Sequence, residues 1–416
     1  MQEITLYIEE LCRRAKESAR ALASAPSEKK NAVLLRAAEL LRLRADEIVL
    51  QNARDMESAA ENGVKSVMLD RLKLDRARIE GIADSLVSLA SLADPIGEGE
   101  QWTRPNGLKI RRVRVPLGVI GVIYEARPNV TADVAALCIK TGNAVVLRGG
   151  KEALHSNLAL ADILREALVS EGLPADAVSL VARTEREGAT ALMTMRGLID
   201  LLIPRGGKGL IRAVVEGASV PVIETGAGNC HVYIDESADI EMALKVTENA
   251  KLSRPAVCNA AESLLVHRAI ADRFLPRFAA QTEGRLILRG CEKTLAILPT
   301  AERASEEDYE TEYDDCILAV RVVDSLDEAI AHINRYTTSH SEAILTNDLS
   351  AAARFKSEVD AACVYVNAST RFSDGGEFGF GAEVGISTQK LHARGPMGPD
   401  ALTTVKYEIE GNGQIR

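Results

Sequence analysis

The stretch LGVIGVIYEARPNVTADVAALCIKTGNAVVLRGG, residues 117–150, decides the fold class of this chain. It begins with LGVIGVIYE, an apolar run that is typical of a buried strand. NVTADVAALCIKTG then repeats apolar residues at helical spacing and stops at Gly142, and AVVLRGG is a second apolar run. A strand, a helix and a strand in this order predict two parallel strands joined by a crossover helix.

The same alternation continues after residue 150 in two blocks. The first predicts strands at VSLVA (178–182), LIDLLIP (198–204) and VPVIETG (220–226), with helices at 154–172, 189–195 and 206–217. The second predicts strands at 262–267, 316–323, 343–347 and 363–367, with helices at 269–281, 327–336 and 351–358. Ser325 and Glu328 form a capping box before one of these helices. We therefore expect an α/β protein with two parallel sheets, and ligands beyond the carboxyl ends of the first sheet's strands.

Helices and exposed strands flank these blocks. The first hundred residues show helical spacing throughout. Residues 109–115 alternate like an exposed strand after an Asn106–Gly107 turn, and TTVKYEIEG (403–411) alternates like an edge strand. We expect the 403–411 strand to pair with the 109–115 strand of another subunit.

Composition excludes several classes of protein. The chain has 416 residues and a formal charge of −10, which disfavours nucleic-acid and anionic-membrane partners. No apolar run is long enough to cross a bilayer, and acidic residues within the first apolar pattern argue against a signal peptide. The seven cysteines are scattered without a C-x-x-C pair, so we expect no disulfide framework and no metal site, in a cytosolic setting.

Cys258, in SRPAVCNAAESLLVH (253–267), is the first candidate for chemistry. A buried, packed thiol is the commoner role of such a cysteine. A nucleophilic thiol needs an accessible, electropositive setting, and Cys258 follows Arg254 at the junction of the two α/β blocks. Asn129, after the first strand, is a candidate to hold an oxyanion with its side-chain amide, or alternatively to cap the helix that follows.

Glycines and cations follow strands of the first block. Gly206 and Gly207 lie between a strand and a helix, where a backbone can approach a phosphate, although simple turns also use glycine there. No G-x-G-x-x-G motif follows the first strand. Arg148 and Lys151 follow the second strand, where basic residues suit the 2′-phosphate of NADP, or are merely solvated.

Five long blocks resemble the aldehyde dehydrogenase superfamily, and most closely its branch that reduces acyl phosphates, the γ-glutamyl phosphate reductases. In chain order they are EARPNVTADVAALCIKTGNAVVLRGGKEA (125–153), ETGAGNCHVYID (224–235), RPAVCNAAESLLVH (254–267), TTSHSEAI (337–344) and FGFGAEVGISTQKLHARGPMG (378–398). The resemblance implies that family's fold, in which a parallel-sheet cofactor domain and a second α/β domain are joined by a small strand module. The expected divisions are a cofactor-binding domain (1–100 and 116–224), a catalytic domain (225–394) and oligomerisation strands (101–115 and 395–416).

The resemblance also assigns roles to individual residues. Cys258 matches the nucleophile, and Asn129 matches the asparagine of the oxyanion hole. Glu224 matches the glutamate that activates water in hydrolytic relatives. These matches imply that a thioacyl intermediate forms on Cys258 when glutamyl 5-phosphate loses its phosphate, and that hydride from NADPH then yields glutamate 5-semialdehyde on the route to proline.

Cofactor contacts follow from the same resemblance. Gly206 and Gly207 match the turn beside the cofactor pyrophosphate, and Arg148 and Lys151 remain the candidates for the 2′-phosphate. Glu312 falls where relatives keep a glutamate for the nicotinamide ribose, although Asp314 and Asp315 replace the residues usual after it. Ser253 stands where this branch usually has glutamine.

Substrate contacts and partners are less closely defined. Arg371, Ser373 and His340 are the candidates to bind the amino and carboxylate groups of the substrate, with a structural role as the alternative for each. The resemblance implies a cytoplasmic homo-oligomer, a dimer or tetramer, and a functional association with glutamate 5-kinase.

Two rival functions stay open at this point. A hydrolytic semialdehyde dehydrogenase would use Glu224 to release a free acid. A cofactor-binding or scaffold protein with a degenerate site is disfavoured because Cys258, Asn129 and Glu224 are all present.

Overall fold

The computed structural model describes residues 2–64 and 66–416, which form two compact units. Unit 1 comprises Met1–Thr225, Gly379–Gly385 and Met397–Arg416, and unit 2 comprises Gly226–Phe378 and Ile386–Pro396. The chain therefore leaves unit 1 after Thr225 and returns to it twice near its end. Within the described ranges, every helix is too short or too polar to span a bilayer.

Unit 1 is built around a four-stranded parallel sheet in the order β5-β4-β3-β6, which confirms the expected fold class. Helices α1, α8 and α9 pack on one face of this sheet, while α6 and α7 contact it through β4 and β5. The strands are β3 (Val119–Tyr124), β4 (Ala144–Arg148), β5 (Val178–Leu180) and β6 (Leu201–Arg205). The helices are α1 (Gln2–Ala23), α2 (Ser27–Leu43), α3 (Ala45–Glu61), α4 (Ser66–Leu72), α5 (Arg76–Ser91), α6 (Asn129–Lys140), α7 (Leu154–Ser170), α8 (Arg186–Met193) and α9 (Lys208–Gly217).

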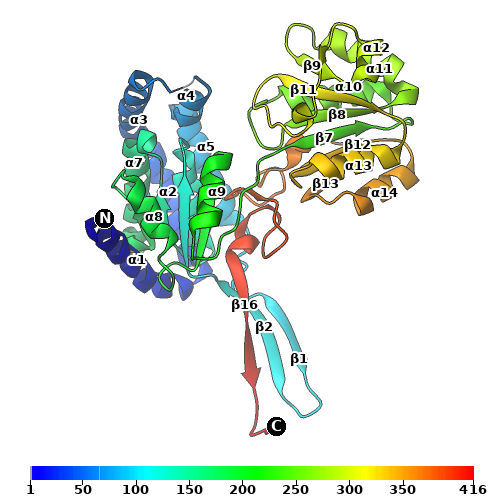
Figure 1. Cartoon of the computed structure of the whole chain (residues 1–416). Coiled ribbons are helices and arrows are strands. Elements are labelled where there is room, and N and C mark those ends of the chain that lie inside the picture. Colours follow the sequence, from blue (N-terminus) through cyan, green and yellow to red (C-terminus); the bar gives the residue numbers. More distant parts are fainter. Residues whose placement is uncertain (1, 65) are drawn as a thin grey trace. The chain divides into compact units, whose positions relative to one another are not determined.

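A three-stranded antiparallel sheet, which we call the arm, extends from unit 1 (Figure 1). Its order is β1-β2-β16, with β1 at Gly99–Thr103, β2 at Lys109–Pro116 and β16 at Thr403–Glu410. β16 pairs with β2 of the same chain over eight residues, so the expected pairing with another subunit is wrong. The hydrophobic side chains of β16 are instead exposed: Val405, Tyr407 and Ile409.

Unit 2 holds a seven-stranded parallel sheet in the order β10-β9-β11-β8-β7-β12-β13. One hydrophobic core lies between the sheet and α10 and α11, and a second lies under α13 and α14. The strands are β7 (Cys230–Ile234), β8 (Ala261–His267), β9 (Ile287–Gly290), β10 (Glu302–Arg303), β11 (Ile317–Val323), β12 (Ser341–Leu345) and β13 (Cys363–Val366). The helices are α10 (Ile240–Leu252), α11 (Arg268–Gln281), α12 (Glu292–Ile297), α13 (Leu326–Tyr336) and α14 (Leu349–Glu358).

Two local predictions, the capping box at Ser325 and the strand at 220–226, have different outcomes. The capping box is correct at Ser325, whose Oγ accepts a hydrogen bond from the Glu328 N–H at 3.2 Å. The Glu328 carboxylate, however, accepts from the N–H of Asp324 at 2.8 Å. The strand expected at 220–226 does not form, because the segment makes only one isolated bridge, between Val222 and Leu202 of β6.

Candidate active site

Cys258 lies in the loop that joins α10 to β8, at the amino edge of the unit 2 sheet. Because parallel strands begin at one edge, the segments that precede β7, β8, β11 and β12 meet there. Two close contacts join three of these segments. The N–H of Gly228 donates to Glu312 Oε1 at 2.9 Å, and a Cβ on Gly228 would lie 1.4 Å from the carbonyl oxygen of Cys258.

Neighbouring residues hold the main chain at Cys258 in place. Position 228 accepts only glycine, because any side chain would overlap the Cys258 carbonyl. The same carbonyl accepts a hydrogen bond from Cys230 Sγ at 3.2 Å. Cys258 itself is only half-buried, so the loop combines a fixed main chain with a partly exposed cysteine.

Two arginines make the surroundings of Cys258 electropositive. Burial and the neighbouring Arg254 lower the pKa of Arg371, whereas Cys258 and Asp374 act in the opposite direction. Arg371 donates from Nε to Ser253 Oγ at 3.2 Å. Cations near a thiol favour its thiolate form, so this setting is that of a reactive cysteine.

Asn259, which the sequence analysis did not single out, ties the Cys258 loop to the segment that carries Arg371. Its side-chain amide donates to the carbonyls of Ser373 (3.0 Å) and Arg371 (3.3 Å), and its Oδ1 accepts from the Arg371 guanidinium. Thr370 Oγ1 in turn donates to the Asn259 carbonyl at 2.7 Å. The position of Arg371 therefore depends on the residue that follows Cys258.

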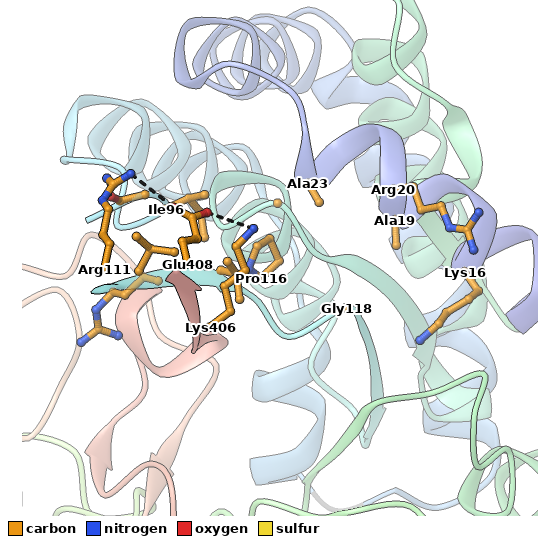
Figure 2. Close-up of a pocket in the computed structure, with 15 residues that line it drawn as sticks. Lys16, Ala19, Arg20, Ala23, Ile96, Arg111, Pro116, Gly118, Lys406 and Glu408 are labelled. Carbon is orange, nitrogen blue, oxygen red and sulfur yellow. Dashed lines mark hydrogen bonds and ion pairs between the residues drawn. The ribbon is translucent and has the colours of Figure 1, made fainter. Parts of the chain in front are cut away.

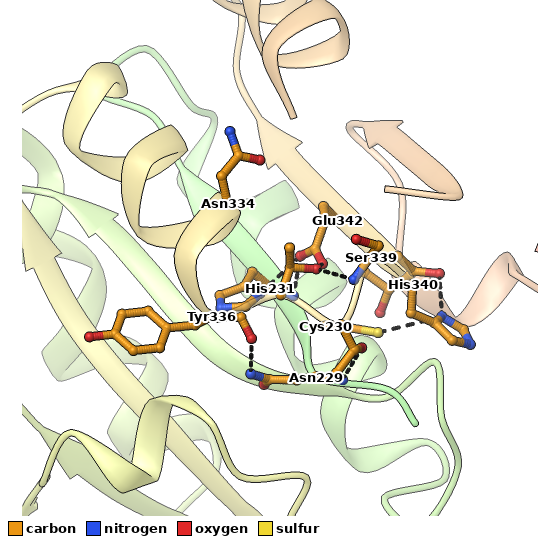
Figure 3. Close-up of polar contacts among 12 residues, drawn as sticks. Asn229, Cys230, His231, Asn334, Tyr336, Ser339, His340 and Glu342 are labelled. Atoms are coloured by element: carbon orange, nitrogen blue, oxygen red, sulfur yellow. Dashed lines mark hydrogen bonds and ion pairs between the residues drawn. The ribbon is translucent and has the colours of Figure 1, made fainter. Parts of the chain in front are cut away.

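His340 and Ser373 belong to a buried polar network next to this loop, and Figure 3 shows the part of it that contains His340. His340 Nδ1 is 2.8 Å from Ser341 Oγ and 3.7 Å from Cys230 Sγ. Ser373 Oγ is 2.5 Å from Ser341 Oγ and 2.7 Å from the Tyr365 hydroxyl. Both residues are fully buried, so the structure supports the structural alternative for them over contact with a substrate.

The rest of the network holds the start of β7 in place. Figure 3 shows Asn229, whose amide donates to the Tyr336 carbonyl at 2.8 Å, beside His231, whose Nδ1 lies 3.0 Å from Glu342 Oε2. Burial raises the pKa of the Cys230 thiol well above its usual range. Cys230 therefore remains a neutral thiol that supports Cys258.

Four of the cofactor candidates lie on unit 1, at the carboxyl edge of its sheet, whereas Glu312 belongs to unit 2. Gly206 and Gly207 form the turn between β6 and α9. The N–H of Gly207 donates to Glu125 Oε2 at 2.9 Å, and a Cβ on Gly206 would lie 2.5 Å from the same oxygen. Glu125, which directly follows β3, is thus a second residue that sequence reasoning missed.

Two observations test whether this edge fits a dinucleotide with a 2′-phosphate. The glycine turn leaves the N-terminus of α9 accessible, since residue 207 is exposed. Arg148 Nε is buried and makes no hydrogen bond within the described part of the chain. Burial lowers the pKa of Arg148, nearby Glu152 acts to raise it, and Arg186 lowers it further. Together with exposed Lys151, these cations fit a bound phosphate.

Asn129 and Glu224 also belong to unit 1. Asn129 is the first residue of α6, whose N-cap is Pro128, so the capping alternative for Asn129 is wrong. Its Nδ2 donates to Asp133 Oδ2 at 3.0 Å, which orients the amide. Glu224 is half-buried, next to Thr225, which donates from Oγ1 to the Pro204 carbonyl at 2.7 Å.

Comparisons with known proteins agree over nearly the whole chain. The model of the aldehyde dehydrogenase family matches residues 6–315 and 309–387. The gamma-glutamyl phosphate reductase of Moorella thermoacetica is 57% identical over 415 residues, covering 99% of both chains. That of Caldanaerobacter subterraneus is 54% identical over 413 residues, covering 99% of this chain and 100% of the relative. The crystal structure of the gamma-glutamyl phosphate reductase of Thermotoga maritima superposes with a TM-score of 0.95 at 48% identity, covering 98% of this chain and 99% of that one.

Proposed function

Because the chain belongs to the aldehyde dehydrogenase family, we propose that it reduces L-glutamate 5-phosphate to L-glutamate 5-semialdehyde and phosphate with NADPH. This reaction is the second step of proline biosynthesis from glutamate. The chain is an oxidoreductase of that family. The observation that carries the proposal is the 57% identity over 415 residues to a gamma-glutamyl phosphate reductase.

Cys258 is the nucleophile in this proposal. Its thiolate, favoured by Arg254 and Arg371, attacks the γ-carbonyl carbon of the acyl phosphate, and the C–O bond to phosphate breaks. A thioester forms on Sγ and inorganic phosphate leaves. Covalent catalysis divides one displacement into two easier steps.

The developing oxyanion needs hydrogen-bond donors. We assign this role to the N–H of Cys258 and to the Asn129 amide. An amide has two N–H donors, so Asn129 keeps one for the substrate while the other binds Asp133. Gly228 and Cys230, which hold the Cys258 main chain, keep that N–H in a constant orientation.

NADPH, when bound, supplies the hydride that converts the thioester to a thiohemiacetal. In the proposal, Gly206 and Gly207 admit its pyrophosphate at the N-terminus of α9, while Arg148 and Lys151 bind the 2′-phosphate. Glu312 is assigned to the nicotinamide ribose, although its Oε1 already accepts from the Gly228 N–H.

Hydride addition leaves an alkoxide on the former carbonyl carbon, and one proton converts it to the thiohemiacetal hydroxyl. When that proton is removed again, the C–S bond breaks and releases the aldehyde and the Cys258 thiolate, so no net proton is consumed. Glu224 is the proposed group for moving this proton. Arg371, unlike buried Ser373 and His340, remains the proposed partner of the substrate carboxylate.

Location and assembly follow as part of the proposal. Unit 1 binds the cofactor and unit 2 carries the nucleophile. The exposed apolar side chains of the arm support a homo-oligomer, a dimer or tetramer. All seven cysteines are free thiols, which supports a reducing cytoplasm. Functional association with glutamate 5-kinase would supply the unstable acyl phosphate.

The reverse reaction tests this function. The protein is mixed with glutamate 5-semialdehyde and NADP, and NADPH absorbance is followed with and without phosphate or arsenate. We expect strict dependence on the anion, loss of activity in Cys258→Ala, and normal activity in Cys316→Ala, a half-buried cysteine of the same unit. Turnover without any anion would identify a hydrolytic enzyme that uses Glu224, and equal rates with NAD would overturn the cofactor preference.

A further inference from the structure

Unit 1 contains a cavity of about 560 Å³ that none of the roles assigned above uses (Figure 2). It lies where α1 faces the base of the arm, and its walls come from α1, β2 and β16. Its volume falls within the range of about 300–1,000 Å³ that small-molecule sites occupy. No residue assigned to the nucleophile, the cofactor or the substrate lines it.

The wall of the cavity is strongly cationic. Five basic side chains line it, namely Lys16, Arg20, Arg111, Arg114 and Lys406, and Glu408 is the only acidic one among its described lining residues. Such a concentration of positive charge contrasts with the chain's formal charge of −10. Positive charge gathered in a concave site attracts anions.

Neighbouring carboxylates neutralise only part of this charge. Glu408 lies between two cations, 3.5 Å from Arg111 and 3.1 Å from Lys406, as Figure 2 shows. Lys16 binds Asp200 at 2.6 Å. Five cations less these two carboxylates leave three positive charges.

Arg20 is the lining cation with the fewest polar partners in the described part of the protein. Its side chain is exposed and takes part in no hydrogen bond or ion pair within residues 2–64 and 66–416. Arg114, by contrast, donates to Thr403 Oγ1 at 2.8 Å. Figure 2 shows Arg20 on α1, across the cavity from Arg111 and Lys406 on the arm, so the cavity has cations on two opposite sides.

Several of the remaining lining residues are apolar, and some of these are small. Ile96, Val113 and Val115 contribute hydrocarbon surface, and Ala19 and Ala23 of α1 leave room above it. Small lining residues keep the space open, and apolar ones favour a ligand with a hydrocarbon body. Inorganic ions would leave this surface uncovered.

We propose that this cavity binds a small organic dianion, in which two anionic groups are separated by a short hydrocarbon body. One anionic group contacts Arg20 on α1, and the other contacts Arg111 and Lys406 on the arm. The hydrocarbon body lies on Val113 and its neighbours. A ligand so bound stabilises unit 1 by mass action, because only the folded chain brings α1 and the arm together.

Succinate is the probe, measured by calorimetry and by thermal unfolding of the full chain. Succinamide, which has the same body without charge, controls for the hydrocarbon. Inorganic phosphate controls for charge alone, and sodium chloride at matched ionic strength controls for screening. We expect saturable binding of succinate, weaker binding of phosphate, no binding of succinamide, and an unfolding temperature that rises with succinate alone.

Variants that should change the affinity for succinate in opposite directions locate the site. Arg20→Gln/Lys406→Gln should weaken succinate binding by about tenfold, since two charge-assisted contacts are lost. Glu408→Gln should tighten it, because a repulsive carboxylate is removed, and a folding defect would not produce that gain. The matched control is Arg36→Gln/Arg112→Gln, which removes one helical and one arm cation that form other ion pairs.

Three results would overturn the proposal: no saturable binding, equal affinity in all variants, or phosphate binding as tightly as succinate. The reductase assay separates this proposal from the proposed function. Arg20→Gln/Lys406→Gln should retain wild-type turnover without succinate, so a failure here leaves the reaction of Cys258 untouched.

Discussion

Lys251 Nζ lies 2.5 Å from Glu262 Oε2, and both side chains are fully buried. Lys251 is near the end of α10 and Glu262 is near the start of β8, so the pair closes the loop that carries Cys258 at its base. Burial raises the pKa of Glu262 to about 8, although Lys251 acts to lower it. The pair thus positions the candidate nucleophile at a cost in desolvation.

Breaking this pair should destabilise the protein. Lys251→Met or Glu262→Gln should lower the free energy of unfolding by about 3–5 kcal/mol, because a buried group loses its partner. The double variant Lys251→Met/Glu262→Leu should recover most of that loss. Denaturant unfolding measures both effects, and Arg212→Ala, which breaks the exposed pair with Glu216, should cost only about 0.3–0.5 kcal/mol. Equal costs for the exposed and buried pairs would contradict this account.

Gly228→Ala should lower turnover sharply. The new Cβ would meet the Cys258 carbonyl at 1.4 Å, so the nucleophile loop must move. Such a displacement commonly costs about a hundredfold or more in rate. Gly81→Ala in α5 is the control, since nothing lies within 4 Å of its Cβ and alanine should stabilise the helix by about 0.5–1 kcal/mol. Normal activity in Gly228→Ala would show that this loop can shift freely.

Arg371→Gln should slow alkylation of Cys258 at neutral pH. Removing a nearby cation disfavours the thiolate form of Cys258, and the thiolate is the species that iodoacetamide alkylates. The measurement is the pH dependence of the iodoacetamide rate, with Cys258→Ala to identify the reacting thiol. Arg371→Lys keeps the charge and should restore most of the profile. An unchanged profile in Arg371→Gln would remove Arg371 from the activation of Cys258.

His332 should make the protein less stable in acid. Burial, and next the neighbouring His231, lower the pKa of His332 from 6.5 to about 3. Between these values the unfolded chain binds a proton that the folded chain does not, so stability falls as pH drops from 6.5 towards 3. His332→Phe should flatten this part of the unfolding profile, and the aromatic neighbours Tyr309 and Tyr336 favour that substitution. His332→Leu is a second variant, and a slope unchanged in both would exclude His332 as the source.

Most strands of the parallel sheets were predictable because they are largely apolar, and several of the helices between them end at glycines. Residues 119–124 of β3 are buried along their whole length, which is why the pattern was clear. β7 was missed because Cys230 and His231 are polar in sequence, and only the fold supplies buried partners such as Glu342. The register of β16 could not be predicted either, since pairing depends on chain geometry and not on alternation alone.

In the candidate site, too, residues could be identified from the sequence, but the contacts that the fold creates between them could not. Cys258 and Arg371 were found from sequence, but they are coupled through Asn259, which binds Arg371 across 112 residues of sequence. His340 and Ser373 have side chains suited to binding a substrate, and only burial distinguishes them from Arg371. The sequence did not single out Glu125, because a carboxylate that follows a strand can have many roles. Its contact with Gly207 depends on two strands lying side by side.

The pairing of β16 with β2 also sets an order for folding during synthesis. β2 leaves the ribosome nearly three hundred residues before Thr403. The buried amide of Asn143 is likewise made 259 residues before Leu402, whose carbonyl accepts its hydrogen bond at 2.8 Å in the finished protein. Most of unit 2 is made in the interval, so it can fold while the edge of β2 is still unpaired. The amino-terminal half of the protein is therefore completed by some of the last residues that the ribosome adds.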